Sequence, residues 1–376
     1  MHGQIAKTSP MLRDAMHHAS RPMERRDLGA VAAMFGAAFR GGRVAPGLEA
    51  YLETFCFGHP QLTSETGSRV YESETGELSA AVLCVPLRFR VDGQPVTARL
   101  LCNFMAVGEA GARGAACLSR HFRAKRHDFL FSDTASEASS THWKTGGGRI
   151  LPIQSLEWCR VFRPLTACAR RMHRSLRGEA GGLLLAPLSM LDKGARRHRP
   201  LLVAHMPEGV TVQEVGPTQF LAETRPMFGR FSVHPDWDPS EFAWLSRMAE
   251  ANPALGPLHF ALMHDASGAT IGAAAYCGTG RGRASVLNLL CLEGHERESV
   301  AALLADLDRQ GYCEARGATQ PFLMQALQAQ KHMCFRHRGF FCIAGRMPAL
   351  HRALDQDLVY AEGLSSESWS RLLTDF

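Results

Sequence analysis

The 376-residue sequence lacks three features, and each absence excludes a class of protein. No run approaches the ~20 consecutive apolar residues that a membrane-spanning helix needs. No two cysteines have the CxxC spacing and no compact Cys/His cluster occurs, so we expect no metal site. The eleven cysteines are odd in number and mostly lie in apolar runs, which favours buried, reduced thiols over a disulfide framework.

Residues 1–21 lack the apolar core of a signal peptide. They are polar with scattered basic residues, so we interpret them as a flexible lead-in and expect a cytoplasmic protein. The chain as a whole is 45% hydrophobic and 21% charged, which is typical of a globular protein. Its length is sufficient for two domains of ordinary size.

The most informative stretch runs from Leu100 to Gly147. The apolar segment Leu100–Val107 reads as a strand and leads into a Gly/Ala-rich turn. A helix is predicted over Cys117–Arg126, a second strand over Asp128–Phe131 and a second helix over Ser136–Lys144. The stretch therefore alternates strand, turn, helix, strand and helix.

The turn in this stretch, residues 111–116, consists of small residues around a single arginine. Backbone N–H groups at a helix start are unpaired and carry the positive end of the helix dipole, so they bind a diphosphate that can come close. Small residues permit that approach, although they equally suit a tight turn feeding a closely packed helix. The guanidinium of Arg113 matches phosphate geometry, or is simply a solvent-exposed turn residue.

This arrangement resembles the acetyl-CoA site of the GNAT (GCN5-related) N-acyltransferases. The motif of that family is Gln or Arg, two residues, Gly, one residue, then Gly or Ala; Gly114 and Ala116 fit its last two positions, whereas Gly111 departs from the first. The resemblance implies acetyl-CoA, or another acyl-CoA, as co-substrate. It also implies that the pantetheine arm pairs with the main chain at the strand end, and that the diphosphate lies on the turn. The implied cofactor-binding residues are Met105, Ala106, Val107, Gly111, Ala112, Arg113, Gly114, Ala115 and Ala116.

A weak internal repeat extends the resemblance to the rest of the chain. The turn and apolar strand at Glu74–Cys84 recur at Asp265–Cys277, and the helix from Ala116 recurs as a helix predicted over Glu296–Gln310. The helix Ser136–Lys144 and the glycine after it recur as a helix predicted over Phe322–Lys331 and Gly339. We therefore predict an α+β fold of two GNAT-like domains in tandem, each a mixed, mainly antiparallel sheet flanked by helices. The predicted ranges are 22–165 and 208–348, with a basic linker at 166–207 and a C-terminal extension at 349–376. Two unrelated α+β domains would produce a similar order of strands and helices.

The two halves differ at the phosphate turn. In the second half the corresponding segment, Glu293–Ser299, holds three glutamates and one glycine. Carboxylates repel a diphosphate, so the first half is expected to bind the cofactor.

Acyl transfer to an amine requires a group that accepts the amine proton. The candidate catalytic residues are Glu109, Asp133 and His142. His142 adjoins Trp143, near the place where the resembled family carries an acidic Tyr; Asp133 could equally be a turn residue and His142 a helix-end residue. Glu137 reads as part of a capping box that begins at Thr134.

The sequence thus predicts an acyl-CoA-dependent N-acyltransferase, most simply an acetyltransferase, with a small-molecule or peptide amine as acceptor. One alternative is transfer from an acidic acyl-carrier protein docked on the arginine-rich linker, or from aminoacyl-tRNA. Another alternative is a non-catalytic binding protein on the same scaffold. No basic patch interleaved with aromatics occurs, so nucleic acid is not the expected partner.

Overall fold

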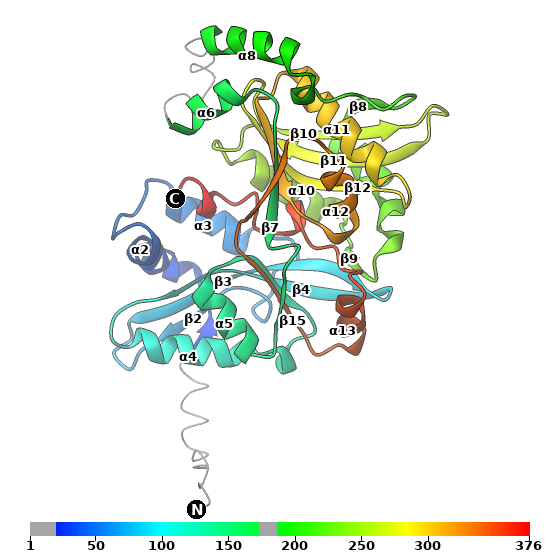
Figure 1. Ribbon diagram of the computed structural model, residues 1–376. Coiled ribbons are helices and arrows are strands. Elements are labelled where there is room, and N and C mark those ends of the chain that lie inside the picture. The colour runs from blue at the N-terminus through cyan, green and yellow to red at the C-terminus, as the bar shows by residue number, and fades with distance from the viewer. Residues whose placement is uncertain (1–19, 173–185) are drawn as a thin grey trace, which may run out of the picture.

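The computed structural model describes residues 20–172 and 186–376. The predicted lead-in therefore lies almost wholly outside the described residues. Two α+β halves, each built on a mixed, mainly antiparallel sheet, lie one above the other in Figure 1. This confirms the predicted fold class.

The first half follows the predicted order of elements. Its strands are β1 (Ser20–Pro22), β2 (Arg69–Glu72), β3 (Leu78–Val91), β4 (Gln94–Ala106), β5 (Leu130–Ala135), β6 (Arg149–Leu151) and β7 (Leu156–Val161). Its α-helices are α2 (Leu28–Phe39), α3 (Leu48–Phe57), α4 (Gly111–His121), α5 (Glu137–Thr145) and α6 (Pro164–Met172), with short 3-10 turns η1 (Arg25–Asp27) and η2 (Ala124–Arg126).

The second half begins after α8 (Ala186–His198) and η4 (Pro200–Leu202). Its strands are β8 (Thr211–Val215), β9 (Val233–Pro235), β10 (Leu258–His264), β11 (Thr270–Cys277), β12 (Arg283–Cys291), β13 (Glu314–Ala318), β14 (Met333–His337) and β15 (Phe340–Ala344). Its helices are α9 (Pro217–Thr224), η5 (Arg225–Arg230), α10 (Pro239–Glu250), α11 (Glu296–Gln310), η6 (Pro321–Leu323), α12 (Met324–Gln328), α13 (Pro348–Asp355), η7 (Gly363–Ser365) and η8 (Arg371–Leu373).

The two halves exchange a strand. The first sheet has the order β1-β2-β3-β4-β5-β15-β6, with β9 on the far end of β3, and the second has the order β14-β7-β13-β12-β11-β10-β8. Thus β7, within the range predicted for the first half, pairs with β13 and β14, while β15 pairs with β5 and β6. Figure 1 shows β7 rising to the upper sheet and β15 descending to the lower one. Sheet membership therefore crosses the predicted domain boundaries.

Local sequence explains the longest hairpin. β3 is a nearly unbroken apolar run with almost every residue buried, as a strand packed on both faces requires. Asp92 and Gly93 join it to β4 with φ of 47° and 75°, the left-handed pair that a tight two-residue hairpin needs.

The main hydrophobic core lies between the sheets and takes residues from both halves. The last part of the chain closes it, because Leu364, Trp369, Leu372 and Phe376 are all buried there. Helices α4 and α5 pack on the first sheet, and α11 packs on the second. The core is thus shared, and the C-terminal segment is one of its components.

Two arginines of the predicted basic linker, Arg171 and Arg196, form ion pairs within the chain, as does Arg163 just before it; residues 173–185 of the linker lie outside the described residues. Arg163 and Arg196 both pair with the buried Asp308 of α11, and Arg171 pairs with the buried Glu314 of β13. These arginines hold α6 and α8 against the second half rather than forming a free basic surface.

Candidate active-site cleft

A cleft opens where β4 and β5 part. These two parallel strands pair only at Arg99–Leu130 and Leu100–Phe131. Beyond Leu100 they diverge, and a cavity of about 340 Å³ lies between them. Its lining comes from both strands and from α4 and α5, and includes Leu101, Cys102, Asn103, Phe104, Leu118, Ser119, Phe122, Ser132, Thr134, Ala135, Ser139, His142 and Trp143.

A β-bulge at Asn103 shapes one wall of the cleft. Val82 pairs with Phe104 and Leu83 with Cys102, so Asn103 is the extra residue of β4, and its φ is 24°. A bulge of this kind redirects the strand and its polar groups. The Asn103 side-chain oxygen is buried without a hydrogen-bond partner in the described part of the chain. Because buried polar groups are normally satisfied, this oxygen is available to a ligand.

The cleft also reaches the side of the sheet that carries α2 and the C-terminal segment. There it is lined by Phe39, Arg40, Leu372 and Leu373. Arg40 donates to the carbonyl oxygens of Phe39 and Leu372. The cleft thus has an apolar mouth with one cation on the face opposite to α4 and α5.

Of the three predicted catalytic residues, only His142 lines the cleft. Its exposed ring lies edge-on to that of Phe104, with the ring centroids 6.5 Å apart. Glu109 is exposed in the loop before α4 and is not part of the lining.

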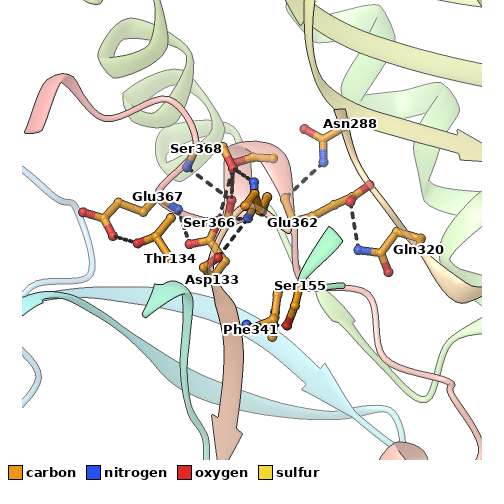
Figure 2. A network of polar contacts seen from close by, with 12 residues as sticks. Asp133, Thr134, Ser155, Asn288, Gln320, Phe341, Glu362, Ser366, Glu367 and Ser368 are labelled. Atoms are coloured by element: carbon orange, nitrogen blue, oxygen red, sulfur yellow. Dashed lines mark hydrogen bonds and ion pairs between the residues drawn. The ribbon is translucent and has the colours of Figure 1, made fainter. Parts of the chain in front are cut away.

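Asp133 is a structural anchor. It is fully buried and pairs with Arg338 at 2.5 Å, and it also accepts hydrogen bonds from the Ser368 hydroxyl and the Glu367 N–H. Figure 2 shows these contacts joining β5 to the C-terminal segment. Both carboxylate oxygens of Asp133 thus have partners within the chain, and its role as a base stays a prediction.

The capping box predicted from Thr134 does not form, because α5 begins two residues later. The N-cap of α5 is Ser136, whose side chain accepts from the Ser139 N–H at 3.2 Å. Thr134 is still part of β5, and its hydroxyl donates to Glu367 instead.

The Gly/Ala run is not a turn before a helix but the first part of α4 itself. A Cβ on Gly114 would lie 2.7 Å from the Cβ of Ala80 and 2.9 Å from Cδ1 of Tyr71. A Cβ on Gly111 would lie 3.2 Å from the carbonyl carbon of Ala106. Both glycines are buried, so their small size lets α4 approach the sheet.

The other predicted cofactor residues lie near the start of α4 and outside the cleft lining. Met105 packs in the main core, and the Val107 N–H donates to Ser79. Ala106, Ala112 and Ala116 are exposed and Ala115 is half-buried. The cleft lies further back because the strands part at Leu100, five residues before the predicted contact at Met105.

Arg113 is exposed and pairs with the equally exposed Glu74 at 3.0 Å. Such surface pairs contribute little to stability, so an anionic ligand can replace the glutamate.

The buried carboxyl group beside the cleft that sequence reasoning missed is Glu367. Burial, and then the charge of Asp133, raise its pKa to about 8. It reaches the cleft wall only because the C-terminal segment folds back between the two sheets. Residues 360–369 have no helical or strand periodicity from which this position could be predicted.

In the second sheet the equivalent position is filled by the chain itself. Leu287 is the extra residue of a bulge between β11 and β12, as Asn103 is in the first sheet. Asn288, beside it, donates to Tyr360 and to the Glu362 carbonyl and accepts from the Leu364 N–H. The C-terminal segment therefore occupies the second sheet at its bulge.

Three solved structures resemble the whole arrangement. A GCN5-related N-acetyltransferase from Anabaena variabilis matches with a TM-score of 0.54 and 10% identity, over 86% of this chain and 71% of that one. A probable N-acyltransferase of unknown function from Enterococcus faecalis matches with a TM-score of 0.51, 10% identity and the same coverage. A GCN5-related N-acetyltransferase from Kribbella flavida matches with a TM-score of 0.50 and 13% identity, over 86% of this chain and 70% of that one.

The chain has the tandem GNAT fold. This confirms the resemblance and the two-part architecture predicted from the sequence. No protein-family model matches the sequence, and a search of curated proteins finds no relative.

Two structural features are absent from the described residues. Within residues 20–172 and 186–376, no group of three or more His, Cys, Asp and Glu side chains is placed to hold a metal ion. No helix in the same residues has the length and hydropathy needed to span a membrane.

Proposed function

We propose that this GNAT-like chain is an acyl-CoA-dependent N-acyltransferase whose co-substrate lies in the cleft between β4 and β5. The observation that carries the proposal is the parting of two parallel strands beside a bulge, with an unpaired polar group at the bulge. A parted strand offers free backbone groups to an extended ligand, as an added strand would. The pantetheine arm of an acyl-CoA is such a ligand, since it carries amide groups along an extended chain.

The diphosphate is assigned to the start of α4, near Ala112 and Arg113. N–H groups in the first turn of a helix have no intrahelical acceptor, and the helix dipole favours an anion there. Arg113 can exchange Glu74 for phosphate. Gly111 and Gly114 contribute by letting α4 approach the sheet, not by contacting phosphate.

The first half is favoured as the cofactor site because the C-terminal segment already occupies the second sheet. The first turn of α11 is also acidic, and Glu296 at its start pairs with Arg230. An amine acceptor then approaches from the mouth formed by Phe39, Arg40, Leu372 and Leu373.

The test is calorimetric titration with acetyl-CoA, using two neighbouring positions on α5. Ser139 lines the cleft, whereas Ala138 beside it is exposed and outside the lining. Ser139→Trp should fill the cleft and abolish one-to-one binding, and Ala138→Trp should bind as the unmodified protein does. If no acyl-CoA binds the unmodified protein, or if Ser139→Trp binds normally, the proposal fails.

A further inference from the structure

Glu367 lies at the point where β4 and β5 part. Its carboxylate accepts a hydrogen bond of 2.8 Å from the hydroxyl of Thr134 on β5. The thiol of Cys102, on β4, lies near the same carboxyl group and donates to the Leu100 carbonyl oxygen. Thr134 and Cys102 both line the cleft, so the carboxyl group lies directly behind the cleft wall and is bonded to β5.

The second carboxyl oxygen of Glu367 has no assigned role in the fold. The residue is 1% exposed, and its Oε1 has no hydrogen-bond partner in the described residues. A buried carboxyl oxygen without a partner is costly, so it is unusual as a purely structural feature.

The surrounding contacts fix the position of this side chain. The Glu367 N–H donates to Asp133, whose other oxygen holds Arg338 and Ser368. Figure 2 shows Glu367 directed to Thr134 while its neighbour Glu362 is directed the opposite way, to Gln320. The segment is therefore anchored independently of the Glu367 carboxyl group.

We propose that Glu367, acting through the Thr134 hydroxyl, accepts the proton that an amine loses when it attacks an acyl thioester in the cleft. This inference rests on the proposed function. Thr134 is the residue that contacts the amine, and Glu367 is a positioning residue that stores the proton behind it.

The proton balance of the step is simple. The amine nitrogen forms a bond to the thioester carbonyl carbon, and its proton passes to the Thr134 oxygen as the hydroxyl proton of Thr134 passes to Glu367. The carbon–sulfur bond then breaks and coenzyme A leaves as a thiolate. The protonated Glu367 returns its proton through Thr134 to that thiolate or to water, which restores the starting state.

The charge environment suits this exchange. The titratable groups that face Glu367 are Asp133, Arg338, Cys102 and Tyr51. Burial and Asp133 raise the carboxyl pKa to about 8, whereas Arg338 opposes the rise. A base with a pKa near the working pH is the most effective proton acceptor. Because only the ionised form accepts a proton, turnover should rise with pH up to about 8.

The experiment measures acetyl-CoA consumption with benzhydrazide and a panel of primary amines. Benzhydrazide is weakly basic, so its own ionisation does not shape the pH profile near neutrality. For Glu367→Gln we expect kcat to fall about 100-fold, as the loss of a general base does. The KM for acetyl-CoA should stay unchanged, and the rise of kcat towards pH 8 should vanish.

Two variants separate this role from a structural one. Glu362→Gln removes an equally buried carboxyl group whose pKa burial also raises to about 8, but which faces the second sheet, so the pH profile should persist. Thr134→Ser keeps the hydroxyl and should retain most of kcat, whereas Thr134→Val should behave like Glu367→Gln. A Glu367→Gln variant with normal kcat and normal pH profile overturns the proposal.

A binding measurement covers the case in which no amine of the panel is acylated. The infrared band of the protonated Glu367 carboxyl group, identified by its loss in Glu367→Gln, should shift when acetyl-CoA binds. If acetyl-CoA binds and the band does not shift, the role of Glu367 is overturned and the proposed function stays intact. If acetyl-CoA does not bind at all, the proposed function fails and this inference fails with it.

Discussion

At the scale of single residues, the same glycines suit two explanations that only geometry separates. Gly114 fits a phosphate-binding motif, yet its α-carbon faces Ala80 and Tyr71 in the packed interface under α4. A small residue near the start of a helix thus indicates either a ligand-binding site or a close packing contact. In this chain packing accounts for it, so mutations at the motif test stability before they test binding.

Gly114→Ala should destabilise the fold by about 1–3 kcal/mol, because the added methyl group overpacks a rigid interface. Gly194, within α8, is a matched control, since a Cβ there meets nothing within 4 Å. Gly194→Ala should stabilise by about 0.5–1 kcal/mol through helix propensity alone. Urea unfolding of both variants measures the difference, and equal effects at the two sites would contradict the packing explanation.

The two buried glutamates of the C-terminal segment make stability depend on pH. Burial raises the pKa of Glu362 and Glu367 from 4.5 to about 8 in the folded protein. Between those values the folded state holds protons that the unfolded chain has released, so stability falls as pH rises from about 5 to 8 and levels off above.

The variant Glu362→Gln/Glu367→Gln should have a flatter dependence, because glutamine stays neutral throughout. The measurement is the difference in unfolding free energy between this variant and the parent at pH 5, 6.5 and 8. Taking a difference cancels the groups common to both proteins. A difference that does not change with pH would show that neither carboxyl group titrates in this window.

At the scale of elements, periodic segments were predictable and the segments that build the site were not. The helix predicted at Glu296–Gln310 is α11 with the same bounds, because a long amphipathic run fixes its own structure. The helix predicted at Phe322–Lys331 is shortened to η6 and α12, since residues 329–332 form the turn that leads into β14. The cleft depends on where β4 leaves β5, which is set by the bulge at Asn103 and by tertiary pairing.

The C-terminal segment shows most clearly why local sequence is insufficient. Gly363 has φ of 62° and lies against the bulge of β12, where a Cβ would meet the Leu287 carbonyl oxygen at 2.1 Å. This contact places the segment, and with it Glu367. A glycine in a polar stretch predicts a turn, but its partner lies 76 residues away in sequence and has no local signal.

Gly363→Ala should therefore lower the unfolding free energy by about 3 kcal/mol or more, which is above the usual range for single substitutions. Gly268→Ala is the matched control, because Gly268 also has positive φ (85°) but open space around it. The unfolding free energy of the control should fall only by the conformational cost of a left-handed alanine, about 1–2 kcal/mol. Hydrogen exchange should rise over residues 358–376 in Gly363→Ala alone. If both variants lost the same unfolding free energy, Gly363 would not be what places the C-terminal segment.

At the scale of the whole molecule, strand exchange makes the two GNAT-like halves interdependent. β15 lies between β5 and β6 in the first sheet, and β7 lies between β13 and β14 in the second. Each half thus supplies an interior strand to the other, and the main core takes side chains from both. Long-range pairing of this kind binds the chain into one cooperative unit, even though the sequence repeat suggests two separable domains.

Expressed alone, residues 20–206 should not fold, because β5 and β6 would lose their shared partner β15 and β5 would be left as an unpaired edge. Residues 207–376 should fail for the same reason, since β13 would lose β7. The two pieces expressed together should recover a folded complex with the near-ultraviolet circular dichroism and single melting transition of the intact chain. If residues 20–206 alone melted cooperatively with a native spectrum, the exchanged strands would be accessory, and the cleft between β4 and β5 would be a property of the first half by itself. Failure of each piece alone, with recovery together, means that the cleft exists only in the intact molecule, because β5 and the C-terminal segment that frame it are held by the second half.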